Sequence, residues 1–141
     1  MHDETINRTM RNTSDYSIIE NETKVADKTL QQLRENYVLA SSDYRMRRPI
    51  PTLEEFFITC KNSGIFPIPE IKTSGTTTEH VNKAFKLGKE ILGEGNFGFC
   101  SFSYDLLDYV RSLSEKTPLW YIGNSILGTT NSITNESRET T

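Results

Sequence analysis

Apolar residues recur with a helical period in three stretches of the chain, and a short apolar run follows each stretch. The first stretch opens at Thr52, where Thr52 and Glu55 have the spacing of a capping box, and Gly64 can end it in a left-handed turn. The second follows the threonines at 76–78, and Gly93 can close it. The third runs from Ser103 to Leu113. We therefore expect three amphipathic helices.

The apolar runs that follow these helices predict strands. They cover Ile65–Ile71, Phe97–Phe102 and Leu119–Ile122, and the middle run is rich in aromatic residues. Helix and strand then alternate with short connections, a pattern typical of a parallel sheet covered by helices. The expected fold class is α/β.

The two ends of the chain lack this alternation. Residues 1–50 are polar and irregular, with one helix expected near Thr29–Asn36. After Gly123 the chain is dominated by Ser, Thr and Asn, which offer little apolar surface to bury. We expect a domain over residues 1–122 and a polar, disordered tail over 123–141.

Composition excludes several classes of protein. The 141 residues carry a net charge of −3, whereas nucleic-acid binders usually have a basic surplus. The one basic cluster, Arg45–Arg48, is interpreted as a solvated loop. No apolar stretch approaches the roughly 20 residues that span a bilayer, and no signal peptide begins the chain, so a soluble protein of unknown compartment is expected. Cys60 and Cys100 lack the paired spacing of a zinc site, and Cys60 fits a helix core.

Glu70 and Lys72 are the strongest chemical signal. Alternate residues of a strand point the same way, so both side chains should project together from the end of the expected strand. A carboxylate can hold a divalent cation, and a lysine beside it can meet the phosphate that the cation neutralises. The pair suits phosphodiester chemistry, although two such residues also form ordinary surface ion pairs.

Six segments in order resemble one family. His2–Thr9 is similar to a motif of His-Asp, a leucine-like residue and Arg-Thr, and Asp27–Leu33 to an Asp-x-Thr-Leu-x-Glu-Leu segment with Gln32 in place of the glutamate. The segments Ile50–Glu55, Pro69–Lys72 and Ser101–Ser103 match a helix start, an acidic strand motif and the next strand; Leu119–Ile122 fits the strand after that. This order resembles the glycerophosphodiester phosphodiesterases, which are TIM barrels.

The resemblance implies an activity and a role for four residues. The family hydrolyses glycerophosphodiesters to an alcohol and glycerol 3-phosphate with a divalent metal. By this resemblance His2 is one of two histidines acting as general acid and base, and Asp3, its motif neighbour, helps to orient the loop. By the same resemblance Glu70 is a ligand of Ca²⁺ or Mg²⁺, and Lys72 places positive charge beside the phosphate. The alcohol and the metal are not indicated by the sequence.

Other parts of the family pattern have no counterpart in the chain. The His-Arg-Gly motif, the Glu-Asn pair and the Glu-x-Asp motif of the first two strands are missing, as are the last two strands. About half a barrel remains, so the expected fold is a partial TIM barrel. One carboxylate cannot satisfy Ca²⁺, which takes six to eight oxygens. The chain is therefore expected to be a truncated piece that is inactive alone.

Two alternatives remain open. The chain could be a non-catalytic remnant that binds a partner through exposed sheet edges. It could also complete a barrel by associating with a missing half or with a second copy of itself. Individual residues have simpler interpretations as well. His2 and His80 are interpreted as solvated surface residues, and five aromatic residues are interpreted as core: Phe97, Phe99, Phe102, Trp120 and Tyr121.

Overall fold

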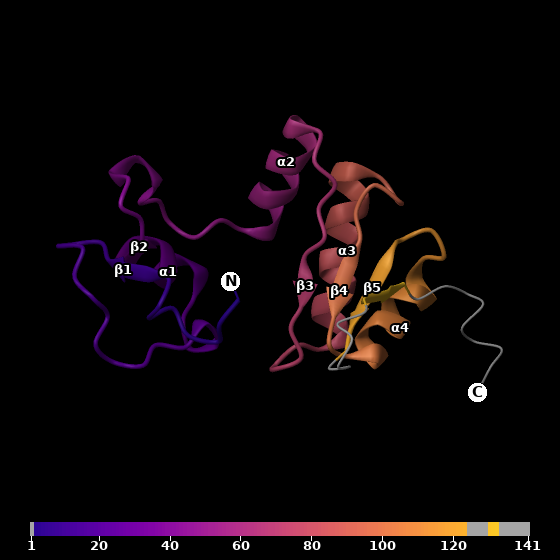
Figure 1. Ribbon diagram of the computed structural model, residues 1–141, viewed down its shortest axis with the longest axis horizontal. Helices are drawn as coiled ribbons and strands as arrows, with labels where there is room; N and C mark the ends of the chain where they lie inside the picture. Colours follow the sequence, from indigo (N-terminus) through magenta and orange to yellow (C-terminus); the bar gives the residue numbers. More distant parts are fainter. Residues whose placement is uncertain (1, 124–129, 133–141) are drawn as a thin grey trace. The chain divides into compact units, whose positions relative to one another are not determined.

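The structure is a computed structural model that describes residues 2–123 and 130–132. The chain divides into two compact units, Met1–Pro51 and Thr52–Thr141. Figure 1 shows the elements of each unit in sequence colours.

The first unit has a small core of its own. Strand β1 (Met10–Asn12) pairs antiparallel with β2 (Tyr37–Leu39), and helix α1 (Leu30–Asn36) leads directly into β2. Two short 3₁₀ turns, η1 (Val25–Asp27) and η2 (Tyr44–Met46), complete the unit. Its core consists of four buried residues, Ile6, Met10, Ile19 and Leu33.

The expected helix near Thr29–Asn36 is confirmed, and a capping box between Thr29 and Gln32 starts it. The expectation that the rest of residues 1–50 is irregular misses the β1–β2 pair. Three-residue strands are too short to show an alternating pattern, and the core residues that hold them are widely spaced in the sequence.

The second unit alternates helices and strands as the sequence predicts. Parallel strands β3 (Glu70–Ile71), β4 (Phe99–Ser101) and β5 (Leu119–Ile122) lie side by side in that order. Helices α2 (Leu53–Ser63), α3 (Thr78–Leu92) and α4 (Tyr104–Leu113) connect or precede them. This confirms the α/β class with a parallel sheet (Figure 1). No closed barrel is formed by the described strands.

A fourth strand, β6 (Thr130–Ser132), pairs antiparallel with β5. It falls within residues 123–141, for which a disordered tail is expected. Residues 124–129 and 133–141 lie outside the described part, so the rest of that expectation stays a prediction.

The helix boundaries follow their capping residues. Thr52 accepts a hydrogen bond from the Glu55 amide while the Glu55 carboxylate accepts one from the Thr52 amide, which confirms the predicted capping box. Gly64 ends α2 with a φ of 66°, a backbone conformation that glycine adopts without steric cost. Thr77 caps α3 in the same reciprocal manner, with His80 as its partner.

The two faces of the sheet in the second unit differ in chemistry. One face packs against α3 and α4 through Ile71, Phe99 and Leu119, which are almost fully buried. Register partners in a parallel sheet point to the same side, so Glu70, Cys100 and Trp120 share the opposite face. Glu70, the candidate metal ligand, therefore lies on the face opposite α3 and α4.

The expected strand Ile65–Ile71 is paired as a regular strand only at its end, Glu70–Ile71. Pro67 and Pro69 interrupt it because neither has an amide hydrogen to donate. Their carbonyls still accept hydrogen bonds across the sheet, from the amides of Gly98 at 3.0 Å and Cys100 at 3.2 Å. The prolines thus shorten the strand without detaching the segment from β4.

Among the described residues no helix is both long enough and apolar enough to cross a membrane.

Candidate functional site

Glu70 and Lys72 form an ion pair at the end of β3. Lys72 Nζ lies 2.8 Å from Glu70 Oε1, and both side chains are partly exposed, at 35% for Lys72 and 23% for Glu70. The contact confirms that the two side chains project together, as the strand period predicts. A half-buried pair of this kind keeps one carboxylate oxygen and the other ammonium hydrogens available for further contacts.

The ion pair of Glu70 and Lys72 lies at the carboxyl end of β3. Ile71, between the two charged residues, packs into the core, and Ser101 Oγ donates a 2.7 Å hydrogen bond to its carbonyl oxygen. The buried Ser101 hydroxyl also accepts a hydrogen bond from the Ser103 amide, which precedes α4. Strand β3 is therefore held to β4 directly beside Glu70 and Lys72.

Cys100 is the register partner of Glu70 on β4. Burial raises the pKa of its thiol, the nearby Glu70 carboxylate raises it further, and Lys72 acts in the opposite direction. A thiol with a raised pKa stays protonated near neutrality and is a weak nucleophile. Cys100 thus places an uncharged thiol beside the ion pair of Glu70 and Lys72.

An aromatic surface continues the same face. Trp120, the register partner of Cys100, meets Phe66 edge to face at 6.5 Å between ring centroids. Gly98 makes room for the indole, because a Cβ at that position would lie 2.5 Å from Trp120 Cζ3. Of the five aromatic residues expected to be core, Phe97 and Phe99 are buried, Trp120 and Tyr121 are partly buried, and Phe102 is 47% exposed.

His2 belongs to a separate cluster in the first unit. Its Nδ1 lies 2.9 Å from Asp3 Oδ1, and Arg8 contacts the same carboxylate through Nε at 2.6 Å and Nη2 at 2.9 Å. The hydrogen bond from Arg8, followed by that from His2, holds the pKa of Asp3 well below its usual range. An ionised carboxylate only accepts hydrogen bonds, so Nδ1 of His2 carries the proton and donates it.

This contact leaves Nε2 of His2 as the nitrogen that can take up or release a proton. The imidazole side chain is 77% exposed, and Asp3 fixes its orientation. The motif residues His2, Asp3 and Arg8 thus contact one another in the structure. His2 and Glu70 belong to different compact units, and a shared role for them stays a prediction.

The metal ligands are the weakest part of the candidate site. No group of three or more His, Cys, Asp or Glu side chains within residues 2–123 and 130–132 could hold a metal ion. Glu70 supplies one carboxylate, and Lys72 occupies one of its oxygens. The described residues therefore do not make a complete divalent-metal centre.

His80 has a structural role that sequence reasoning missed. Its Nδ1 accepts a hydrogen bond from the Thr77 amide at 3.2 Å, and its own amide donates to Thr77 Oγ1. A capping box normally carries Glu or Gln at this position, so a histidine there does not match the usual sequence pattern. The spacing of three residues from the capping threonine was the available signal.

Comparison with known proteins identifies the family. The chain matches the model of the glycerophosphoryl diester phosphodiesterase family over residues 1–136. No curated protein sequence matches it significantly. Among solved structures it is similar to a protein from Silicibacter pomeroyi DSS-3 assigned to the glycerophosphoryl diester phosphodiesterases, with 19% identity and a TM-score of 0.72. The match covers 100% of this chain and 53% of that one, so the chain spans about half the length of the related protein. The chain belongs to the glycerophosphoryl diester phosphodiesterase family.

Proposed function

We propose that the chain carries part of the machinery that hydrolyses glycerophosphodiesters to an alcohol and glycerol 3-phosphate. The observation that carries this proposal is the Glu70–Lys72 pair at the end of β3 in a member of this family. The fold supports it because parallel α/β sheets bind ligands at the carboxyl ends of their strands.

Lys72 is proposed to contact the phosphate of the substrate. Its ammonium is held by Glu70 and remains partly exposed, so an incoming phosphodiester anion can share it. An ammonium is a compact charge that meets phosphate oxygens well. Glu70 keeps Lys72 in place between substrate encounters.

His2 is proposed as a general acid or base. Asp3 fixes Nδ1 as a donor, so Nε2 is left to exchange a proton with the reacting oxygen. Such a carboxylate also stabilises the imidazolium when His2 is protonated, as it does in hydrolases that use an Asp–His pair. Arg8 keeps the carboxylate ionised throughout.

The family generally depends on a divalent metal, and we propose Glu70 as one of its ligands, with Ca²⁺ or Mg²⁺ as the ion. Ca²⁺ takes six to eight oxygens and Mg²⁺ six, so the other ligands must come from outside the described residues. We further propose that the chain corresponds to part of a TIM barrel and is a catalytically incomplete piece without the remainder.

The experiment is a complementation assay. Release of glycerol 3-phosphate from a glycerophosphodiester is measured with Ca²⁺ or Mg²⁺, first with this chain and then after addition of a polypeptide carrying the rest of a family barrel. The proposal expects little release by the chain alone and substantial release by the mixture. A mixture that assembles into a stable complex but releases nothing contradicts it.

One observation favours a second candidate, a non-catalytic interaction module. Phe66 and Ile68 precede β3, the edge strand of the four-stranded sheet, and are 44% and 43% exposed. Exposed apolar residues at a sheet edge favour pairing with another chain. Self-association through this edge predicts a dimeric mass that Ile68→Lys reduces to that of a monomer.

A further inference from the structure

The segment Ser41–Arg48 displays two apolar side chains among arginines. Tyr44 is 76% exposed and Met46 is 60% exposed, and both lie in the 3₁₀ turn η2 of the first unit. Arg45, Arg47 and Arg48 surround them in a protein whose net charge is −3. The sequence interpretation of this cluster as a solvated loop does not explain why apolar residues are exposed within it.

Hydrogen bonds hold the segment in a defined conformation. The Asp43 carboxylate accepts a bond from the Arg45 amide at 3.0 Å, and the Asp43 amide donates to Ser41 Oγ at 3.2 Å. Tyr16 Oη donates to the Ser41 carbonyl oxygen and accepts from the Ser41 amide, both at 2.7 Å. These hydrogen bonds order the turn before it binds a partner, so little conformational entropy is lost on binding.

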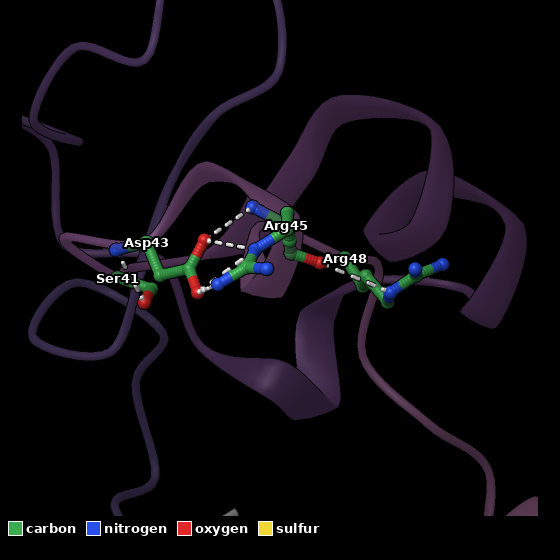
Figure 2. Close-up of polar contacts among 4 residues, drawn as sticks. All are labelled: Ser41, Asp43, Arg45 and Arg48. Carbon is green, nitrogen blue, oxygen red and sulfur yellow. Dashed lines mark hydrogen bonds and ion pairs between the residues drawn. The ribbon is translucent and has the colours of Figure 1, made fainter.

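The three arginines differ in how they are engaged. Arg45 makes a forked contact with Asp43, in which Nη2 lies 2.8 Å from Oδ2 (Figure 2). This hydrogen bond, the largest cause, lowers the pKa of Asp43, so the pair stays ionised and mutually neutralised. Arg47 stacks over the Tyr16 ring at 3.6 Å and donates from Nε to the Ser41 carbonyl.

Arg48 is the arginine best placed to meet a ligand. Its Nε donates to the Arg45 carbonyl oxygen at 3.2 Å, and Figure 2 shows its guanidinium end directed away from Asp43. Its two terminal nitrogens donate no hydrogen bond to any of the described residues. With Arg45 neutralised by Asp43, Arg47 and Arg48 leave a surplus of positive charge around Tyr44 and Met46.

We propose that Ser41–Arg48 is a contact surface for an anionic phospholipid membrane. Guanidinium groups bind lipid phosphates in a forked geometry, and basic residues near a membrane are attracted by its negative surface potential. Tyrosine favours the boundary between headgroups and acyl chains, and the flexible thioether of Met46 can enter it. A soluble polyanion would use the arginines alone, whereas a membrane also uses the two apolar side chains. The combination selects the membrane as partner.

The test is co-sedimentation of the chain with vesicles of phosphatidylcholine, with and without phosphatidylserine, at low and physiological salt. Arg48→Gln removes the available guanidinium and should weaken binding about fivefold, since one basic residue near an anionic surface contributes on that order. Lys28→Gln removes the same charge from an exposed site elsewhere in the first unit and is the matched control. Tyr44→Ala and Met46→Ser should weaken binding without changing its salt dependence.

The proposal expects binding only to vesicles that contain phosphatidylserine, weaker at higher salt, and reduced by Arg48→Gln but not by Lys28→Gln. Equal loss in the two charge variants would overturn it, as would the absence of binding to anionic vesicles at low salt. Inorganic polyphosphate serves as the soluble polyanion. If it binds as tightly as the vesicles do, and if the Tyr44 and Met46 variants bind vesicles normally, the surface is a general polyanion site and the membrane proposal is wrong.

Discussion

Glu70 and Cys100 are register partners on neighbouring parallel strands, so a carboxylate and a thiol share one face of the sheet. Their electrostatic contact is one of the causes that raise the pKa of Cys100, after burial and against the opposing effect of Lys72. Cys100 therefore reports on the charged pair beside it without any catalytic activity being required.

Alkylation of Cys100 should respond in opposite directions to the two charged residues. Glu70→Gln removes a negative charge, lowers the pKa of the thiol and should speed its reaction with iodoacetamide severalfold at a fixed mildly alkaline pH. Lys72→Met removes the positive charge and should slow it. The reaction is run in a chelating buffer. Mass spectrometry of the peptide that contains Cys100 distinguishes its alkylation from that of the buried Cys60. Equal rates in all three proteins would mean that the Glu70–Lys72 pair does not lie beside the thiol.

In an active protein that contains this chain, His2→Ala should lower turnover by a factor of about 10²–10⁴, because His2 is proposed to exchange a proton with the reacting group. Metal affinity, measured by calorimetry, should stay nearly unchanged, because His2 is not proposed as a ligand. Asp3→Asn is the companion variant. An amide can donate to the imidazole as well as accept from it, so the tautomer of His2 is no longer fixed, and turnover should fall while His2 itself remains. If the His2→Ala protein were fully active, His2 would not be a general acid or base in the reaction.

Gly88→Ala should destabilise the second unit although alanine is the better helix former. A Cβ at Gly88 would lie 2.7 Å from Cε2 of Phe97, a ring that is fully buried between α3 and the sheet. The clash should outweigh a helix-propensity gain of about 1 kcal/mol and leave a net loss of about 1–2 kcal/mol in the free energy of unfolding. Denaturant titration measures it. In a Phe97→Leu background the same substitution should cost less; an unchanged cost would show that the ring is not the obstacle.

His80→Ala should weaken the start of α3 by about 0.5–1 kcal/mol, because the Thr77 amide loses its acceptor. His80→Gln should restore most of that stability, since glutamine accepts the same bond in ordinary capping boxes. The same stability for both variants at neutral pH would rule out the capping role.

Much of the second unit could be predicted from the sequence because its signals are local. The helices bounded by Thr52 and Gly64 and by Thr77 and Gly93 begin and end at residues whose chemistry forces the boundary. That the side chains of Glu70 and Lys72 project together follows from the strand period. These features need no knowledge of the distant chain.

The features that sequence reasoning missed depend on distant contacts. The β1–β2 pair joins Met10 to Leu39 through a core whose members are scattered over the first unit. Strand β6 lies in a polar segment whose pairing with β5 has no local signature. A metal centre is likewise a long-range property, and Glu70 by itself does not identify its other ligands.

The most direct measurement of the central claim is turnover of a glycerophosphodiester by an active protein containing this chain, compared with its Glu70→Gln variant at increasing Ca²⁺ or Mg²⁺. Glu79→Gln is the matched control, because Glu79 is a well-exposed carboxylate that also pairs with a lysine, Lys83. The account predicts that Glu70→Gln lowers turnover by orders of magnitude and raises the metal concentration needed, while Glu79→Gln changes neither. Wild-type turnover and metal dependence in Glu70→Gln would contradict it.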